Sequence, residues 1–374
     1  MKHKKELIVV QILPSLESGG VERGTLEVGK HLSEVGIKSI VISSGGRLVK
    51  QLEKEGSLHI QLDVGRKSLT TFFLIFKLAK ILIENKVDIV HARSRLPAWI
   101  VFICLKLIPK MNRPRFVTTI HGPYSINFYS SIMTKGEKVF VISNMIKNYV
   151  TKNYKIEKKK IVLNYRGVDK NEFPYKFKPT KLWTENWHKQ YPELRKKIIL
   201  TLPARLTGWK GQEDFIEMIA ILSKKNYMIH GLIVGEKKHG KNTYYMNLIN
   251  QVKKHGIEKN ITFVGYREDV REIMASSYIV YSLSKAPEAF GRVTLEALKM
   301  GIKVIGYDHG GVREQMRLIL PIGLTMPNNI PKLVNLSELW INNPPIVKET
   351  KFFTLDSMLN KTIKVYRELV GSND

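Results

Sequence analysis

Two glutamates separated by seven residues, Glu288 and Glu296, are the first residues whose spacing suggests chemistry. They lie in the segment Pro-Glu-Ala-Phe-Gly-Arg-Val-Thr-Leu-Glu, where Gly291 frees the backbone before a predicted helix. Glu288 would then lie in the loop before the helix and Glu296 in its first turns, facing the same opening. The backbone N–H groups of such an N-terminus favour an anion. The alternative is a helix-start glutamate beside a solvated surface glutamate.

Two cations flank a glycine turn that follows an apolar run. Arg205 and Lys210 stand on either side of Gly208, directly after residues 198–202. A guanidinium binds phosphate oxygens in bidentate fashion, and an ammonium adds a point charge. Together they suit a diphosphate that departs carrying negative charge. The alternative is that both are solvated loop cations.

Further candidates follow apolar runs in the first half of the chain. Gly19 and Gly20 come after residues 7–13, and glycines there let the backbone approach a phosphate at a helix N-terminus. Their spacing matches neither the dinucleotide fingerprint nor a Walker A loop. His121 follows residues 116–120 and offers a ring nitrogen to a bound sugar. A plain tight turn and a structural histidine are the alternatives.

The elements that must position these residues alternate along the chain. Short apolar runs separated by helix-length amphipathic segments predict βα units on parallel sheets. The runs are 7–13, 39–42, 88–91, 116–120, 138–142, 197–202, 230–234, 261–264, 279–282 and 304–306. They predict an α/β chain of two successive doubly wound domains, in which ligands bind at strand C-termini. The polar, proline-containing stretch 171–195 predicts a linker, the proline-rich region 321–345 predicts a long surface connection, and 354–369 predicts a last helix.

Composition limits the function classes. The 374 residues carry 61 Lys+Arg against 33 Asp+Glu, so the formal net charge is +28. That surplus fits nucleic acid, an anionic membrane surface or a phosphate-rich substrate. The single cysteine, Cys104, excludes an intramolecular disulfide and a zinc site of several thiolates. The sequence has no uncharged apolar stretch of about 18 residues, so it predicts no membrane-spanning helix, and no signal peptide is recognised. We therefore expect a cytoplasmic protein.

The ordered set of motifs resembles the retaining glycosyltransferases of family four, which have the GT-B fold. The set is Gly19-Gly20, His121, Asn-Tyr-Arg-Gly-Val-Asp at 164–169, Arg205 with Lys210, and Glu288 with Glu296. The resemblance implies two Rossmann-like domains facing a central cleft. Residues 1–172 would bind the acceptor and 173–351 the nucleotide sugar, and about 352–374 would cross back onto the first domain. The family motif is usually Asn-Gly-Val-Asp, so Tyr165 and Arg166 depart from it.

The resemblance also implies roles for the candidate side chains. Arg205 and Lys210 would bind the donor diphosphate and stabilise it as leaving group. Glu288 would bond hydroxyls of the transferred sugar, and Glu296 would bond the ribose hydroxyls of the nucleotide. His121 would contact the transferred sugar.

Backbone groups complete the implied donor site. The backbone of Ala289, Phe290 and Gly291 would lie near the sugar and phosphate, and Gly19 and Gly20 would lie under the phosphates. The implied reaction retains configuration, with a leaving-group oxygen taking the acceptor's proton. Nothing implies a metal or a cofactor, because the nucleotide sugar is a co-substrate.

The implied acceptor is a glycan or glycolipid, for which a bacterial lipopolysaccharide core or cell-envelope polysaccharide is the expected class. Residues 69–83 and 98–108 are strongly apolar and adjoin lysines and arginines, a pattern that fits peripheral docking on anionic lipid. The alternative is that both are core helices. Two rival functions remain: a sugar-nucleotide 2-epimerase of the same architecture, and a nucleic-acid-binding protein. We expect no nucleic acid, since no RRM, KH or helix-turn-helix signature appears.

Overall fold

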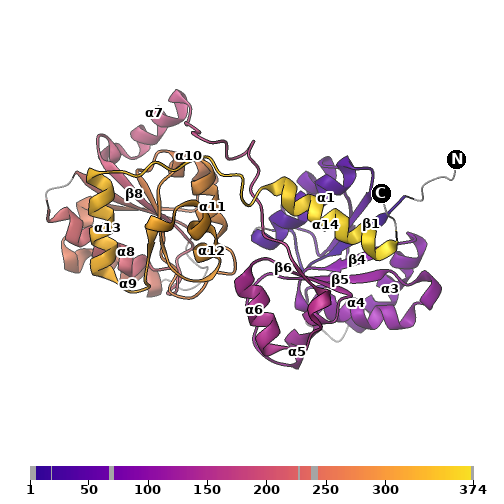
Figure 1. Cartoon of the computed structure of the whole chain (residues 1–374). Coiled ribbons are helices and arrows are strands. Elements are labelled where there is room, and N and C mark those ends of the chain that lie inside the picture. Colours follow the sequence, from indigo (N-terminus) through magenta and orange to yellow (C-terminus); the bar gives the residue numbers. More distant parts are fainter. Residues whose placement is uncertain (1–5, 18, 67–70, 226–227, 237–242, 372–374) are drawn as a thin grey trace. The chain divides into compact units, whose positions relative to one another are not determined.

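The structure, a computed structural model, describes residues 6–17, 19–66, 71–225, 228–236 and 243–371. The chain divides into two compact units: residues 1–166 with 356–374 form the first, and 167–355 form the second. In each unit a parallel sheet is flanked by helices (Figure 1). The α/β class predicted from the alternating apolar runs is therefore confirmed. Positions 69, 70 and 372–374 of the expected segments lie outside the described residues.

The first unit contains a seven-stranded parallel sheet in the order β3-β2-β1-β4-β5-β6-β7. Its strands are β1 (Ile8–Ile12), β2 (Lys38–Ser43), β3 (Leu58–Gln61), β4 (Ile89–Ala92), β5 (Arg115–Ile120), β6 (Lys138–Val141) and β7 (Ile161–Leu163). Its helices are α1 (Gly20–Glu34), α2 (Val49–Lys54), α3 (Thr71–Glu84), α4 (Arg95–Leu107), α5 (Phe128–Ser131), α6 (Asn144–Asn153) and α14 (Leu355–Val370). The central strands are mostly apolar because helices cover both faces of the sheet, and their few polar side chains, such as Gln11 and His91, are buried.

The second unit contains a six-stranded parallel sheet in the order β10-β9-β8-β11-β12-β13. Its strands are β8 (Ile198–Pro203), β9 (Ile229–Val234), β10 (Ile261–Gly265), β11 (Ile279–Ser282), β12 (Val304–Tyr307) and β13 (Leu324–Thr325). Its helices are α7 (Lys181–Gln190), α8 (Gln212–Ser223), α9 (Thr243–His255), α10 (Val270–Ala275), α11 (Arg292–Lys299), α12 (Gly310–Ile319) and α13 (Ile330–Asn342).

The strand order places the candidate loops where each sheet changes direction. The order reverses between β1 and β4 in the first sheet and between β8 and β11 in the second. Crossover connections leave such a point on opposite sides, so the loops after its strands diverge and leave room for a ligand. The segments 13–19, 204–211 and 283–291 follow β1, β8 and β11 directly.

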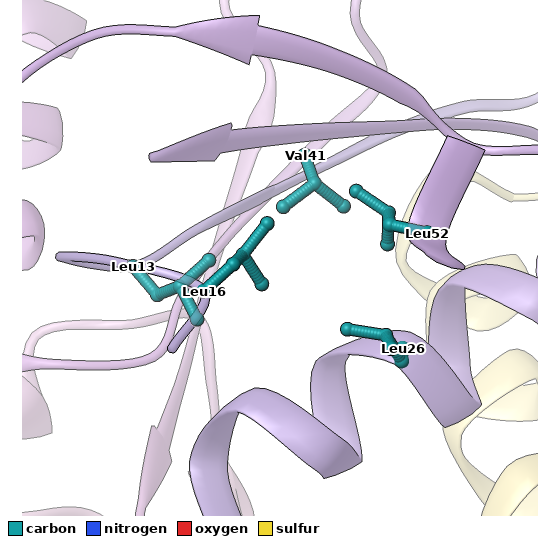
Figure 2. Packing of buried hydrophobic residues seen from close by; sticks show 5 residues of the cluster. All are labelled: Leu13, Leu16, Leu26, Val41 and Leu52. Carbon is teal, nitrogen blue, oxygen red and sulfur yellow. The ribbon is translucent and has the colours of Figure 1, made fainter. Parts of the chain in front are cut away.

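The glycine turn after β1 rests on a buried apolar cluster. Leu13 and Leu16 follow β1 and are fully buried against Leu26 of α1, Val41 of β2 and Leu52 of α2 (Figure 2). Burying a leucine side chain contributes about 1.5–3 kcal/mol relative to leaving it exposed. Both leucines therefore fix the segment that leads into the N-terminus of α1.

Two expectations about connecting segments are wrong. The stretch 171–195 is not a free linker: it includes α7, whose Trp187 packs with Leu194, Leu232 and Ile273 in the core of the second unit. The stretch 321–345 is not a surface connection either. It contains β13 and α13, and the Trp340 side chain of α13 is 2% exposed.

The chain leaves and re-enters the first unit at two neighbouring points. Val168 pairs with Thr354 in a parallel bridge. The Val168 N–H donates to Phe353 O at 3.1 Å, and the Leu355 N–H donates to Val168 O at 3.2 Å. A Cβ on Gly167 would overlap Thr354, so the close approach requires glycine there. The unit boundaries fall at 166/167 and 355/356, against our expected 172/173 and about 351/352.

Candidate active site

The loop from Ala204 to Gly211 carries the two candidate cations and is fixed at both ends. Gly211 precedes α8 in the left-handed conformation, with φ of 78°, and a Cβ there would overlap the Leu283 carbonyl. The Gln212 side-chain amide donates to Arg205 O at 3.0 Å. The Lys285 N–H donates to Trp209 O at 2.7 Å. The loop is therefore held against the segment that follows β11.

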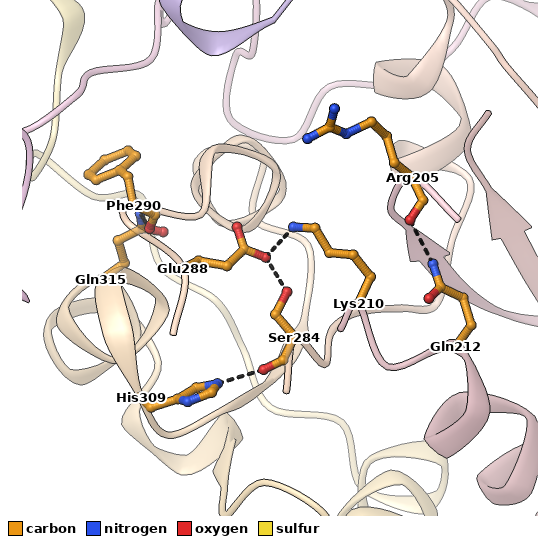
Figure 3. Close-up of polar contacts among 8 residues, drawn as sticks. All are labelled: Arg205, Lys210, Gln212, Ser284, Glu288, Phe290, His309 and Gln315. Carbon is orange, nitrogen blue, oxygen red and sulfur yellow. Dashed lines mark hydrogen bonds and ion pairs between the residues drawn. The ribbon is translucent and has the colours of Figure 1, made fainter. Parts of the chain in front are cut away.

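Lys210 and Glu288 form the centre of the site in the second unit. Lys210 Nζ lies 2.6 Å from Glu288 Oε1, and the two side chains are 15% and 18% exposed (Figure 3). The Ser284 hydroxyl donates to the same Oε1 atom. Lys210 Nζ also lies 4.2 Å from the centroid of the Trp209 ring. The fold thus brings a cation from the loop after β8 into direct contact with a carboxylate from the loop after β11.

Helix α12 clamps the loop that carries Glu288. The Gly311 N–H donates to Glu288 O at 2.7 Å, and the Gln315 side-chain amide donates to Phe290 O at 2.5 Å (Figure 3). His309 Nε2 donates to Ser284 O at 2.6 Å. These contacts hold the loop from both of its ends.

The predicted helix start after Gly291 is confirmed, since α11 begins at Arg292 and Gly291 caps it with φ of 85°. Phe290 is buried, and its ring meets that of Phe353 edge-on. Among the described residues, no acceptor receives the N–H groups of Ala289, Phe290 or Gly291. Unpaired N–H groups at a helix N-terminus are a ready anion site.

Arg205 and Glu296 lie apart from the Lys210–Glu288 contact. The Arg205 side chain is exposed, and its guanidinium makes no hydrogen bond or ion pair within the described part of the chain (Figure 3). Glu296, on α11, is 6% exposed, and its Oε1 accepts from Arg292 Nε at 3.0 Å. Glu296 is therefore more buried than its spacing predicted. A bound hydroxyl would compete with Arg292 for its carboxylate.

The glycine turn of the first unit is open toward solvent at one of its two glycines. Gly19 caps α1 with φ of 144°, and its carbonyl accepts from the Arg23 N–H at 3.0 Å. A Cβ on Gly19 would lie 2.6 Å from Glu22 Oε2, whereas a Cβ on Gly20 would meet nothing within 4 Å. Gly19 is thus required by its backbone conformation, and Gly20 leaves open space at the helix N-terminus.

His121 lies directly after β5 as predicted, and it is joined to a residue that we did not select. Its Nδ1 accepts from Arg166 Nη2 at 2.8 Å. Its Nε2 is shielded from solvent and has no partner within the described part of the chain. Burial, with the nearby charges of Arg166 and Arg93, holds the His121 pKa well below its ordinary value. The ring is therefore neutral at pH 7.

Sequence reasoning missed four residues that shape the two sites: Ser284, His309, Gln315 and Arg166. Arg166 was noted only as a departure from a motif. His309, Gln315 and Arg166 act on partners that are distant in sequence, so spacing carries no signal for them. Ser284 lies only four residues before Glu288, but a loop serine at that distance is not distinctive.

Within the described ranges, no group of three or more His, Cys, Asp or Glu side chains is arranged to hold a metal ion. No helix in these ranges has the length and apolar content needed to cross a bilayer.

Known proteins resemble both units. Residues 18–172 match the family model described as Glycosyltransferase Family 4, and residues 184–351 match Glycosyl transferases group 1. A glycosyltransferase structure from Rickettsia africae ESF-5 is 31% identical, with a TM-score of 0.84 over 99% of this chain and 100% of that one.

Two further relatives are more distant. N-acetyl-alpha-D-glucosaminyl L-malate synthase of Bacillus anthracis is 27% identical over 326 residues, which are 82% of this chain and 80% of the relative. The Anabaena protein HepE, solved with UDP-glucose, is 20% identical with a TM-score of 0.75 over 98% of this chain and 97% of that one. The likeness to HepE concerns the GT-B fold.

Proposed function

We propose a reaction for a chain that belongs to the family-four glycosyltransferases and has the GT-B fold: transfer of a hexose from a nucleotide sugar to a glycan or glycolipid, with retained configuration. The observation that carries this proposal is the contact between Lys210 and Glu288 at the start of α11. A nucleotide sugar presents a diphosphate beside a ring of hydroxyls. An ammonium beside a carboxylate is complementary to that pair of groups.

The departing diphosphate is the group that needs most stabilisation. Lys210 and the exposed guanidinium of Arg205 supply positive charge, and the N–H groups of Ala289–Gly291 supply hydrogen bonds. Donors fixed before the reaction stabilise developing charge without reorganisation during it. Because these groups neutralise the leaving group, we propose that transfer requires no metal ion.

The remaining candidates bind the other parts of the donor. Glu288 accepts hydrogen bonds from hydroxyls of the transferred sugar once Lys210 turns to the phosphate. Glu296 accepts from the ribose, in competition with Arg292. In the first unit, the N-terminus of α1 at Gly19 and Gly20 binds phosphate, and His121 binds the transferred sugar.

Retention follows if the acceptor attacks from the face that the diphosphate leaves. The bond between the anomeric carbon and the phosphate oxygen breaks with its electron pair on the oxygen. The acceptor oxygen bonds to the same carbon, and its proton passes to the departing phosphate. This route uses no side-chain base. Glu288 as a covalent nucleophile is the second mechanism, and it is disfavoured because Lys210 and Ser284 both engage the same Oε1.

The choice of donor and reaction class rests on the relatives. HepE was solved with UDP-glucose, so a UDP-sugar is the first donor to test. The relatives reported above are named a glycosyltransferase and a synthase, which does not favour the 2-epimerase alternative.

The acceptor proposal rests on an exposed stripe of α3. Phe73 and Phe76 are 75% and 63% exposed, and Lys77 and Lys80 are exposed beside them. Positions spaced by three and four residues share one helix face, while Ile75, Leu78 and Leu82 face the core. Aromatic rings beside lysines suit an anionic bilayer. We therefore propose peripheral docking on a membrane that carries the glycolipid acceptor.

In contrast, α4 buries most of its apolar side chains, as the core-helix alternative requires.

A donor panel tests the proposed function. Purified protein is incubated with UDP-, GDP- and ADP-hexoses and an oligosaccharide or glycolipid acceptor, and nucleoside diphosphate release is measured. The anomeric coupling constant of the product reports retention or inversion. Binding is measured separately by thermal shift, because only a bound donor stabilises the fold. Near-normal transfer by folded Lys210→Met and Glu288→Gln variants would overturn the proposal, and isomerised sugar from donor alone would favour the epimerase.

A further inference from the structure

Four basic side chains gather beside the C-terminal ends of β4, β5 and β7, and the proposed reaction uses only one of them. His91 lies in β4 and Arg93 directly follows it, His121 follows β5, and Arg166 comes three residues after β7. His91 and Arg93 are 1% and 2% exposed, and Arg166 is 8% exposed. Such charge is buried only where specific contacts hold it.

Arg166 is held from three sides. Its Nη2 donates to His121 Nδ1 at 2.8 Å, and its Nη1 lies 3.7 Å from Met358 Sδ on α14. On the third side it lies against Gly24 of α1, where a Cβ would come within 2.5 Å of Nη1. The guanidinium thus occupies space that only a glycine on α1 leaves free.

The contact fixes where the proton of His121 lies. A guanidinium has only donors and keeps its charge at any ordinary pH. His121 Nδ1 must therefore accept from it through its lone pair, which leaves the ring proton on Nε2. Protonating Nδ1 would break this bond and add a third positive charge beside Arg166 and Arg93.

The other groups around the His121 ring also do not favour its protonation. His91, on β4, bonds Tyr366 at 2.5 Å through Nδ1 and Thr119 at 2.6 Å through Nε2. Its own pKa is held well below the ordinary value by burial and by the nearby arginines, so the His91 ring is neutral and supplies no charge that would favour protonating His121. Tyr124, in the loop after β5, accepts from the backbone N–H of His121 at 3.4 Å, and this bond does not involve the ring nitrogens.

We propose that Arg166 is a positioning residue that holds His121 as a neutral imidazole with its proton on Nε2, a donor for a ligand oxygen. That Nε2–H has no acceptor within the described part of the chain. A buried donor without an acceptor is unfavourable, so a ligand hydroxyl that accepts from it removes that deficit. That the oxygen belongs to the transferred sugar rests on the proposed function; the tautomer does not. In this role His121 donates a hydrogen bond and does not take the acceptor's proton.

Spectra of the histidine ring nitrogens test the tautomer without any substrate. The full chain is produced with ¹⁵N-labelled histidine, and His121→Gln identifies the His121 signals. We expect the wild-type ring to stay neutral with Nε2 protonated from pH 8 to 5.5. Arg166→Met should give both tautomers and should raise the His121 pKa toward its ordinary value, while burial and Arg93 still oppose the charged ring. Arg166→Lys should restore the Nε2–H form, because an ammonium also has only donors.

A second variant approaches the same contact from α1. Gly24→Ala keeps every polar group, but its methyl displaces Arg166 Nη1. It should shift the His121 tautomer in the direction of Arg166→Met, and it carries the test if Arg166→Met does not fold. A His121 ring that keeps the wild-type tautomer and does not titrate in either folded variant would overturn the proposal. A wild-type ring protonated on Nδ1 would do the same.

The pH profile of sugar transfer extends the test to catalysis. Transfer by Arg166→Met should be reduced most at neutral pH, where part of the His121 ring carries its proton on Nδ1 and has no donor at Nε2. The deficit relative to the wild type should shrink as the pH falls, because the protonated ring donates from both nitrogens. A uniform loss at every pH would mean that Arg166 only supports the fold, and it would overturn the positioning role. If the wild type has the expected tautomer but transfers no sugar, the proposed function fails and the tautomer assignment stands.

Discussion

Replacing Lys210 with methionine should lower both the stability of the second unit and the rate of transfer, by separable amounts. The Nζ–Oε1 distance of 2.6 Å corresponds to about 6 kcal/mol of attraction at an effective dielectric constant of about 20. Desolvation cancels much of this. The side chains are 15% and 18% exposed, so the net cost of removing Lys210 lies between about 0.2–1 kcal/mol for exposed pairs and about 3–5 kcal/mol for buried ones. We expect about 2 kcal/mol.

The double variant separates stability from catalysis. Glu288→Gln alone should also destabilise the second unit, because Lys210 loses its carboxylate partner. Lys210→Met combined with Glu288→Gln leaves no unpaired charge. The double variant should therefore lose about 1–2 kcal/mol less unfolding free energy than the sum of the two single losses. Transfer should stay low in all three variants, with a loss of about 10²–10³ for Lys210→Met from the missing leaving-group charge.

Arg205 provides the matched control. Its guanidinium has no partner in the described part of the chain, so Arg205→Met should change the unfolding free energy by less than about 0.5 kcal/mol while still slowing transfer. Urea unfolding followed by tryptophan fluorescence suits the measurement, since four of the five tryptophans lie between 167 and 355. Strictly additive losses in the double variant, or a destabilised Arg205→Met, would refute the assigned role of the ion pair.

Further outcomes follow from other features. Burial lowers the pKa of His230 to about 4, so stability present above pH 6.5 should be lost as the pH falls toward 4, by about 2 kcal/mol at pH 5, and His230→Gln should flatten this dependence in urea titrations. Phe73→Ser with Phe76→Ser should weaken sedimentation with phosphatidylglycerol vesicles at least tenfold and leave transfer to a water-soluble acceptor intact; unchanged sedimentation contradicts docking through α3. Gly211→Ala should destabilise the second unit by several kcal/mol, because its methyl overlaps the Leu283 carbonyl, whereas a wild-type melting temperature would contradict the required turn. Chelation by EDTA should leave transfer unchanged, and a loss restored by a divalent cation would contradict metal-independent departure of the diphosphate.

The parts of the fold that were predictable are those in which local pattern and tertiary role agree. Fully buried parallel strands such as β12 read as continuous apolar runs, because helices cover both sheet faces. A glycine needed for a left-handed turn before a helix identified the start of α11 at Gly291. Lys210 and Glu288 could be identified as candidates from the sequence, because each follows a strand at the point where the sheet changes direction.

The errors came where polar composition concealed a helix. Trp183, Trp187 and Tyr191 recur every four residues, which is helical spacing, and the rings of Trp183 and Trp187 stack with centroids 5.3 Å apart. Prolines and charges around them suggested a linker instead. Arg166 was missed for another reason. Its partner His121 is 45 residues away, so nothing in the local sequence indicates the contact.

The bridge between Val168 and Thr354 has a consequence for how such a chain is assembled and rearranged. Because the two ends of the second unit are hydrogen-bonded to each other, that unit is an insertion whose entry and exit coincide. A segment with this topology closes on itself without a new loop. Gene exchange at these two positions would therefore replace the whole 167–355 segment. Every strand of the first sheet would stay in its own unit, together with helix α14 from Asp356 onward.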